Sequence, residues 1–289
     1  MVSPVVASEP VIWRVRDREL VLGAVPLLMG IVNVTPDSFS DGGHFLGHDQ
    51  AIAHGLSLVE AGAALLDIGG ESTRPGAQPV PVDEEIARVV PVIRAVAKRV
   101  DVPLSIDTTK LEVAQAALEA GASIVNDVSA LRFTPAMAGL AADEDAGLVL
   151  MHMRGEPRTM QHDPRYTDLF GEISGELETA AALAESVGLD HRAIVLDPGI
   201  GFGKALVDNY RILAHLEVLA RLGYPLMIGH SRKTFLDPDG RYAPAERLAE
   251  SVAAGLMAAL GGARILRVHD VAAHARALVV YRRWLEAKP

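Results

Sequence analysis

Eight short apolar runs recur along this sequence, and each leads into a polar or glycine-rich loop and then into a segment with helical periodicity. The apolar runs cover residues 27–32, 63–68, 102–106, 123–125, 148–151, 193–196, 225–228 and 264–268. The helical patterns cover residues 49–61, 83–99, 111–120, 136–145, 168–187, 207–221, 245–260 and 271–286. Strands that alternate with helices pair in parallel, because each helix carries the chain back along the sheet. The pattern therefore predicts a parallel α/β protein.

A closed barrel and an open sheet are the two ways to arrange such units. Eight units at a mean spacing of roughly 33 residues fit a (β/α)8 barrel of ~250 residues. An open, doubly wound sheet would place a glycine-rich turn directly between its first strand and first helix, whereas the first run here enters a long loop over 33–49. We predict one (β/α)8 TIM barrel over 25–289. An N-terminal extension over 1–24 precedes it, with a short β-hairpin over 11–22 at one barrel end.

Composition and charge exclude several classes of function. Aromatic residues make up only 4% of the chain, which suits an aliphatic core of buried parallel strands and not a surface that stacks nucleobases. The formal net charge of -10 repels nucleic acid and anionic membranes. The absence of cysteine excludes disulfides, zinc–thiolate sites and thiol nucleophiles. Because neither a signal-peptide pattern nor a membrane-length apolar stretch is present, we expect a cytoplasmic protein.

A polar residue stands at or just after the carboxyl end of every predicted strand. These residues are Asn33, Glu71, Asp107, Asn126, His152, Asp197, Ser231 and His269. Active sites of (β/α)8 enzymes occupy this end of the barrel. Any one of these residues can instead cap the helix that follows it. Capping alone is a poor explanation for eight unlike residues at eight strand ends, so the pattern favours a functional site.

Two of the loops at this end are rich in Gly, Ser, Asp, Thr and Pro. The first reads Gly-Ile-Val-Asn-Val-Thr-Pro-Asp-Ser-Phe-Ser-Asp-Gly-Gly over 30–43, and its Asn33 offers a neutral oxygen to a hard cation. The second reads Gly-Gly-Glu-Ser-Thr-Arg-Pro-Gly over 69–76, and its Arg74 suits a carboxylate or a phosphate. Each is compatible with an ordinary surface loop, but such loops also close over active sites.

Carboxylate and amide side chains mark three other strand ends. Asp107 and Asn126 follow adjacent predicted strands, where they can face the edge of a flat heterocycle rich in N–H and C=O groups. Asp197 begins the segment Asp-Pro-Gly-Ile-Gly-Phe-Gly-Lys over 197–204. A nucleotide-binding P-loop would continue with Ser or Thr after the lysine. Ala205 stands there instead, so we reject the nucleotide interpretation.

Basic residues cluster after the last two predicted strands, in Ser-Arg-Lys-Thr-Phe over 231–235 and Arg-Val-His-Asp-Val over 267–271. Such runs are often merely solvated, but barrels commonly bind phosphate with these two loops. Arg267 and His269 are two residues apart, so both side chains can point the same way from an extended chain. Asp270 is placed to cap the final helix.

Taken in order, these motifs closely resemble those of the dihydropteroate synthases, a family of pterin-binding enzymes, from about residue 27 to residue 280. The resemblance implies a Mg²⁺-dependent transferase of folate biosynthesis. Such an enzyme condenses (7,8-dihydropterin-6-yl)methyl diphosphate with 4-aminobenzoate, giving 7,8-dihydropteroate and diphosphate. It further implies a homodimer, for which helices 245–260 and 271–286 could supply the interface, and competition by sulfonamides for the 4-aminobenzoate site.

The resemblance also assigns roles to individual residues. Substrate binding would fall to Thr73, Arg74, Asp107, Asn126, Met151, Asp197, Phe202, Ser231, Lys233, Arg267 and His269. The residues expected to act in catalysis are Asp197, Lys233, Arg267 and His269. Asn33 would contribute to the Mg²⁺ site, and Phe39 to the 4-aminobenzoate pocket. We expect His152 to have a structural role and not a catalytic one.

Three alternative functions remain. A pterin-dependent methyltransferase would share the barrel and a similar polar pocket but should lack the 35–43 signature and the Arg-x-His ending. A non-catalytic pterin-binding paralogue should be altered at Asn33, Arg74, Lys233 or His269, and none of these is altered. A purely structural barrel gives no account of the polar strand ends.

Overall fold

Eight parallel strands form the centre of the molecule in a computed structural model, which describes residues 10–34, 44–72, 76–156, 158–160 and 164–288. The strands are β3 (Leu27–Asn33), β4 (Leu65–Gly69), β5 (Leu104–Asp107), β6 (Ile124–Asp127), β7 (Gly147–Met151), β8 (Ile194–Asp197), β9 (Met227–Ile228) and β10 (Ile265–Val268). Their order is β8-β7-β6-β5-β4-β3-β10-β9. A parallel bridge between Leu196 and Leu226 joins the two outer strands, so the sheet closes into the predicted barrel.

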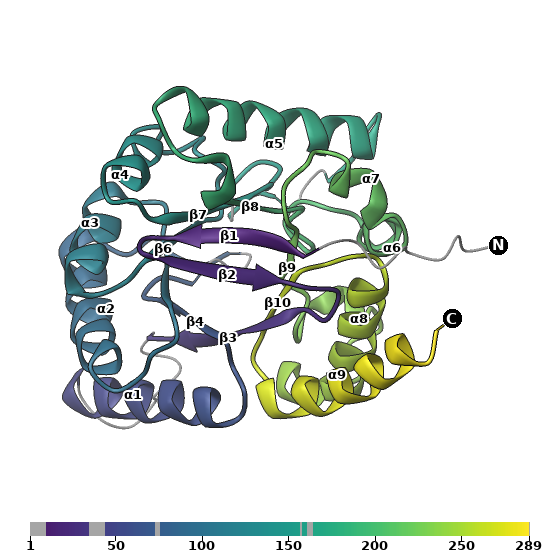
Figure 1. Ribbon diagram of the computed structural model, residues 1–289, viewed down its shortest axis with the longest axis horizontal. Helices are drawn as coiled ribbons and strands as arrows, with labels where there is room; N and C mark the ends of the chain where they lie inside the picture. The colour runs from purple at the N-terminus through teal and green to yellow at the C-terminus, as the bar shows by residue number, and fades with distance from the viewer. Residues whose placement is uncertain (1–9, 35–43, 73–75, 157, 161–163, 289) are drawn as a thin grey trace.

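Helices surround the strands as a ring (Figure 1). They are α1 (His44–Glu60), α2 (Val82–Ala97), α3 (Leu111–Ala120), α4 (Met137–Asp143), α5 (Leu169–Ser186), α6 (Leu206–Ala214), α7 (Leu216–Ala220), α8 (Leu248–Leu260) and α9 (Val271–Glu286). Short 3-10 helices cover η2 (His191–Ala193), η3 (Thr234–Leu236) and η4 (Pro244–Glu246). The alternation of strands and helices predicted from the sequence is confirmed.

Several predicted boundaries are wrong. The segment 207–221, predicted as one helix, is divided between α6 and α7 by His215, whose φ of -135° and ψ of 39° are not helical. Helix α8 begins at Leu248 and not at 245, because Pro244 opens a separate 3-10 turn. Strand β9 contains two residues instead of the four expected over 225–228, and α1 begins at His44 instead of at 49.

The N-terminal hairpin closes one end of the barrel, as predicted. Strands β1 (Val11–Val15) and β2 (Arg18–Leu22) pair antiparallel, and Figure 1 shows them lying across the barrel. Trp13 is fully buried, and its Nε1 donates a hydrogen bond of 2.9 Å to the carbonyl of Ala193. Around it pack the apolar side chains that the strands point inward, among them Met29 and Leu65. Because apolar residues fill this end, polar chemistry is confined to the other end.

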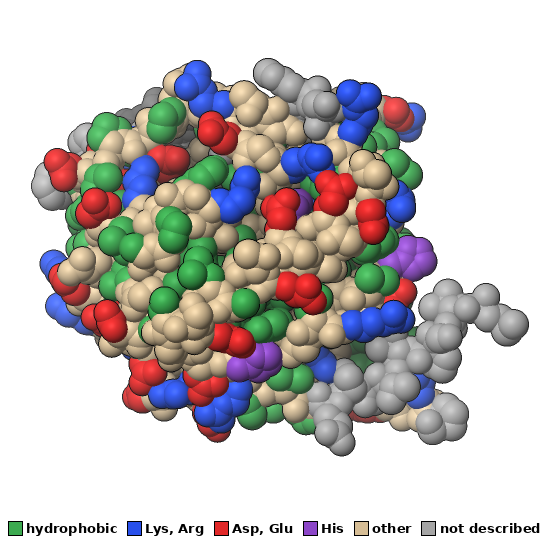
Figure 2. Space-filling view, turned by 90° about the horizontal axis from the view of Figure 1, so that it is seen from above, with side chains coloured by type: hydrophobic (Ala, Val, Ile, Leu, Met, Phe, Trp, Pro, Cys, Tyr) green, Lys and Arg blue, Asp and Glu red, His purple; other side chains and the backbone are tan. Residues whose placement is uncertain are grey.

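The rest of the core lies between the strands and the surrounding helices and is built almost entirely from Ala, Val, Ile and Leu. Among the described helices, none is long and apolar enough to cross a membrane. Acidic and basic side chains are interspersed on the face seen in Figure 2, and the described residues form no continuous basic stripe there.

Candidate active site

Three adjacent strands bring together a floor of polar side chains inside the carboxyl end of the barrel. Asp67 on β4, Asp107 on β5 and Asn126 on β6 are all buried. Asn126 Nδ2 donates to Asp67 Oδ2 over 3.0 Å. Arg267 reaches this floor from β10, donating from Nε to Asp67 Oδ2 at 2.5 Å and from Nη2 to Asp107 Oδ2 at 2.6 Å. The predicted residues Asp107, Asn126 and Arg267 thus lie together.

Asp67 was missed in the sequence because it stands inside the apolar run 63–68 instead of after it. Its side chain is fully buried, although an ionised carboxylate is costly to remove from water. A single acidic residue in the middle of an otherwise apolar strand was the available signal. Its neighbours Leu66 and Ile68 turn outward into the layer beneath the helices, so Asp67 points into the barrel.

The floor carries three oxygen atoms that have no hydrogen-bond partner among the described residues. They are Oδ1 of Asp67, Oδ1 of Asp107 and Oδ1 of Asn126. A buried acceptor left without a partner costs about 1–3 kcal/mol. Three of them on neighbouring strands form an array that is ready to accept hydrogen bonds from the N–H groups of a ligand.

The electrostatics of the floor reflect burial and mutual proximity. Burial raises the pKa of Asp107 to about 7, an effect that the Arg267 charge opposes and the Asp67 charge reinforces. Burial works against the charged form of Arg267, but Asp67 and Asp107 outweigh it and raise the pKa of the guanidinium above its ordinary value. Arg267 therefore stays charged, while Asp107 exchanges a proton near neutral pH.

The wall beside the floor comes from β8 and from the chain after β9. Asp197 ends β8, and its Oδ1 accepts a 2.7 Å hydrogen bond from the backbone of Gly199. Burial raises the pKa of Asp197, and the Lys233 charge opposes this rise. Lys233 Nζ donates to the carbonyl of Ile200 and lies 4.4 Å from the centre of the Phe202 ring. Burial of this ammonium lowers the pKa of Lys233 to about 8.

Ser231 and His269 meet on the next part of the rim. Ser231 Oγ lies 3.1 Å from His269 Nδ1 and accepts a hydrogen bond of 3.2 Å from the backbone N–H of His269. The prediction that Asp270 caps α9 is wrong, since its side chain makes no capping hydrogen bond. Its carboxylate instead accepts two hydrogen bonds from Arg232, of 2.8 and 2.5 Å. This pair ties the chain after β9 to the chain after β10.

The remaining predicted residues lie around this group or outside the described residues. Asn33 ends β3, is half-buried and aligns with Gly69 of β4. Met151 ends β7 in a small buried apolar cluster against which Phe202 packs. Thr73, Arg74 and Phe39 fall outside the residues that the structure describes, as do most of loop 34–44 and part of loop 70–77.

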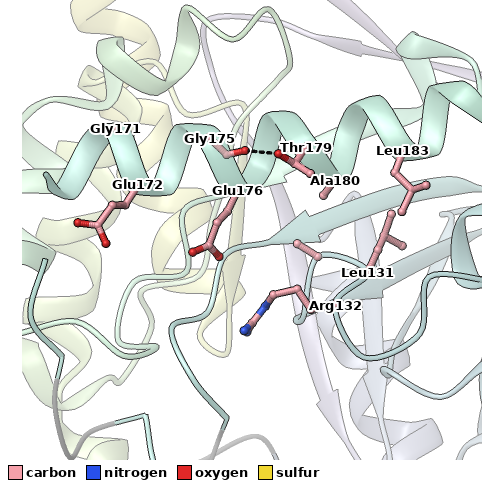
Figure 3. A pocket seen from close by; sticks show the side chains of 10 residues that line it. Leu131, Arg132, Gly171, Glu172, Gly175, Glu176, Thr179, Ala180 and Leu183 are labelled. Atoms are coloured by element: carbon pink, nitrogen blue, oxygen red, sulfur yellow. Dashed lines mark hydrogen bonds between the residues drawn. The ribbon is translucent and has the colours of Figure 1, made fainter. Parts of the chain in front are cut away.

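A separate hollow lies on the outer side of the barrel, between α5 and residues 130–132 (Figure 3). Leu131 and Leu183 line it, and the side chains of Arg132, Glu172 and Glu176 extend into it. It shares no residue with the floor or the wall. The polar floor at the barrel mouth is therefore the candidate active site.

Comparisons with known proteins agree with this site. Residues 29–269 match the family described as pterin binding enzyme. The dihydropteroate synthase of Escherichia coli is 44% identical over 263 residues, which cover 91% of this chain and 93% of that protein. The Xanthomonas albilineans dihydropteroate synthase structure with 4-aminobenzoic acid is 49% identical and superposes with a TM-score of 0.88, covering 96% of this chain and all of that one.

A dihydropteroate synthase from Yersinia pestis, solved with a sulfonamide drug, is 43% identical and has a TM-score of 0.89 over 96% of this chain and 100% of its own. The family match over residues 29–269 includes residues of all eight barrel strands. The chain belongs to the pterin-binding enzyme family, among its dihydropteroate synthases.

Proposed function

We propose that this protein is a transferase of folate biosynthesis. It condenses (7,8-dihydropterin-6-yl)methyl diphosphate with 4-aminobenzoate to give 7,8-dihydropteroate and diphosphate. The observation that carries this proposal is the array of three buried oxygens without partners on Asp67, Asp107 and Asn126. A pterin presents ring N–H and amino groups along one edge, and such an edge supplies the donors that these oxygens lack.

The pterin would lie on the floor, with its donors directed at Asp67, Asp107 and Asn126. Asp197 on β8 and Arg267 both lie close to Gly229, so Asp197 adds a carboxylate beside the floor. This carboxylate could stabilise positive charge that develops on the ring. Met151, buried at the end of β7, offers an apolar contact to the flat heterocycle. Together these side chains would hold the pterin and favour its carrying positive charge as the diphosphate leaves.

The reaction breaks the bond between the pterin methylene carbon and a diphosphate oxygen, and it forms a bond from that carbon to the amine nitrogen of 4-aminobenzoate. The oxygen carries the bonding electrons away, and the nitrogen then loses one proton to solvent or to the departing diphosphate. Because an aromatic amine is uncharged near neutral pH, the protein need not supply a strong base. Its main task is to stabilise the leaving group, which we assign to Arg267 and His269.

We assign the 4-aminobenzoate end to Ser231, Lys233 and Phe202, together with Thr73 and Arg74 of the loop after β4. Lys233 lies over the Phe202 ring, so an aromatic ring and an ammonium are presented side by side. This combination suits a substrate with an aromatic ring and a carboxylate. Sulfonamides share the ring and the aromatic amine, so we propose that they compete for the same place.

We propose Mg²⁺ as the cofactor, with Asn33 as its protein ligand. Among the described residues, no group of three or more His, Cys, Asp or Glu side chains could hold a metal by itself. One neutral oxygen fits Mg²⁺, which keeps much of its water and is commonly held by substrate phosphates. When bound, the ion would neutralise charge on the diphosphate.

We also propose that the protein is a cytoplasmic homodimer and that it binds neither nucleic acid nor membrane.

The dimer contact would lie on α8 and α9, where large apolar side chains are exposed. Among them are Met257, Val280 and Trp284, whose exposed fractions are 53%, 69% and 45%. Such side chains suit a contact between two copies of the chain. Sedimentation of the wild type and of a Val280→Glu variant tests this contact, since the variant should sediment as a monomer.

The function is tested by incubating the purified protein with the pterin diphosphate, 4-aminobenzoate and Mg²⁺ and then separating the products. Dihydropteroate and diphosphate should form in equal amounts. Replacing the pterin substrate with a methylated pterin and a methyl acceptor tests the methyltransferase alternative. Methyl transfer without dihydropteroate formation would refute the proposal.

A further inference from the structure

Lys204 is a buried cation that the proposed mechanism does not use. Only 3% of the residue is exposed, and it immediately follows the glycine-rich turn 199–203. Burial lowers the pKa of Lys204 to about 7, so enclosing this ammonium is costly. A buried lysine that touches no predicted substrate requires another explanation.

Three acceptor atoms surround the ammonium of Lys204. Nζ lies 2.9 Å from Nδ1 of His152, 3.0 Å from the carbonyl oxygen of Phe202 and 3.4 Å from the carbonyl oxygen of His152. An ammonium has three N–H donors and an uncharged amine has two, so three acceptors favour the charged form. The side chain therefore connects the turn after β8 to the end of β7.

The tautomer of His152 fits this arrangement. Burial lowers the pKa of His152 to about 4, so the ring is neutral near neutral pH. Its Nε2 faces Glu176 Oε2 across 3.5 Å, and Figure 3 shows Glu176 extending from α5 into the outer hollow. Because a carboxylate favours a proton on Nε2, Nδ1 is left as the acceptor for Lys204.

The sequence of the turn that Lys204 holds, residues 199–203, does not by itself make its backbone rigid. Gly199, Gly201 and Gly203 all have positive φ, which glycine adopts at little cost. The turn also packs very closely on the end of β7: a Cβ on Gly199 would lie 1.9 Å from the carbonyl oxygen of His152. Its geometry therefore depends on the contacts that fasten it there.

We infer that Lys204 is a positioning residue for the 4-aminobenzoate site, because its ammonium clamps the 199–203 turn to the end of β7. Phe202 packs against the apolar cluster that contains Met151, and Ile200 offers its carbonyl to Lys233. Both contacts depend on the shape of this turn. The pterin floor, in contrast, stands on β4, β5 and β6. Of the other residues assigned to the pterin, Met151 and Asp197 adjoin the clamped turn, but they belong to β7 and β8 and are held by the pairing of these strands. The inference rests on the proposed function. It adds that the affinities for the two substrates depend on different parts of the structure.

The test compares Lys204→Met, which removes all three donors, with Lys204→Gln, which keeps two donors without the charge. KM for 4-aminobenzoate should rise on the order of tenfold in Lys204→Met, the scale of one lost charge-assisted hydrogen bond. The increase should be smaller in Lys204→Gln. The dissociation constant of the pterin diphosphate, from direct titration, should stay within about twofold of wild type because the floor is intact.

Trp13→Phe is the matched control, since it removes a buried hydrogen bond at the opposite, closed end of the barrel. It should lower the melting temperature and leave both substrate constants unchanged. An unchanged KM for 4-aminobenzoate in either folded Lys204 variant would overturn the inference. A parallel loss of both affinities would also overturn it. A wild type that binds the pterin diphosphate but forms no dihydropteroate would instead refute the proposed function.

Discussion

The guanidinium of Arg267 is in direct contact with the carboxylate of Asp107, with 2.6 Å between Nη2 and Oδ2. The same guanidinium binds Asp67, so it bridges two residues of the floor that we assign to the pterin. A pterin that binds the Oδ1 atoms, which Arg267 leaves without a partner, would share both carboxylates with the guanidinium and so weaken their hold on it. We expect pterin binding to loosen this bridge and to leave the guanidinium available to the diphosphate.

Replacing Arg267 with Ala should slow the reaction. The variant loses a charge-assisted contact to the diphosphate. The fall in kcat/KM should therefore correspond to a loss of roughly 1.5–3 kcal/mol of transition-state stabilisation. Steady-state kinetics with both substrates measures this, and circular dichroism checks the fold. An unchanged kcat/KM would remove Arg267 from the mechanism.

The buried carboxyl of Asp107 should make stability depend on pH. Its folded pKa of about 7 lies above the ordinary aspartate value of 3.8, so between these two values the folded state holds a proton that the unfolded state has released. The contribution of this group to stability is therefore present at low pH and is lost as pH rises toward 7. In Asp107→Asn, the fall in melting temperature between about pH 5 and about pH 7.5 should be smaller than in wild type. An equal fall in both proteins would contradict the raised pKa.

Much of the fold could be predicted because it depends on local periodicity. The runs of apolar residues mark the strands, and α3 and α9 begin and end where the helical pattern does. The division of 207–221 into α6 and α7 could not be predicted, since the apolar pattern continues through His215 and only the backbone angles there depart from a helix. The shortness of β9 likewise depends on pairing with a distant strand.

The residues of the candidate site that follow strands could be predicted from the sequence. The residues whose orientation or partner depends on tertiary contacts could not. Asp67 was overlooked because it lies within an apolar run and only the barrel reveals which way it points. The role of Asp270 was mistaken because its partner Arg232 is 38 residues away in the sequence. A capping preference depends on neighbouring residues in the sequence, so it does not predict a salt bridge to a distant residue.

The two substrate ends should respond differently to mutation. Asp107→Ala should weaken binding of the pterin diphosphate by roughly tenfold to a hundredfold or more, because it removes a partner worth about 1–3 kcal/mol or more at a buried edge. Arg74→Ala should leave that binding nearly intact, raise KM for 4-aminobenzoate and slow turnover. Titration of both variants with the pterin substrate, followed by kinetics in 4-aminobenzoate, measures the difference. Equal loss of pterin affinity would mean that both residues serve one site.

Sulfonamides should compete with 4-aminobenzoate and not with the pterin diphosphate. They match 4-aminobenzoate in ring size and in the aromatic amine, and we assign the floor to the pterin and not to this ring. Initial rates at several concentrations of each substrate and inhibitor distinguish the two patterns. Inhibition that is non-competitive with 4-aminobenzoate would place the drug outside the pocket made by Ser231, Lys233 and Phe202.

Magnesium binding should depend on diphosphate. Asn33 supplies one neutral oxygen, so the protein alone should bind Mg²⁺ weakly and should bind it firmly only when a diphosphate group is present. Calorimetric titrations with and without inorganic diphosphate measure this linkage, with Asn33→Ala as the variant that should weaken it. Tight Mg²⁺ binding in the absence of any phosphate would point to a different metal site.

A crystal structure with the pterin diphosphate bound tests the central claim most directly. The donors of the pterin ring should lie within hydrogen-bond distance of Oδ1 of Asp67, Oδ1 of Asp107 and Oδ1 of Asn126, and Arg267 should have withdrawn from Asp107 toward the diphosphate. A pterin bound elsewhere, with these three oxygens still lacking partners and Arg267 still bridging the floor, would contradict the account.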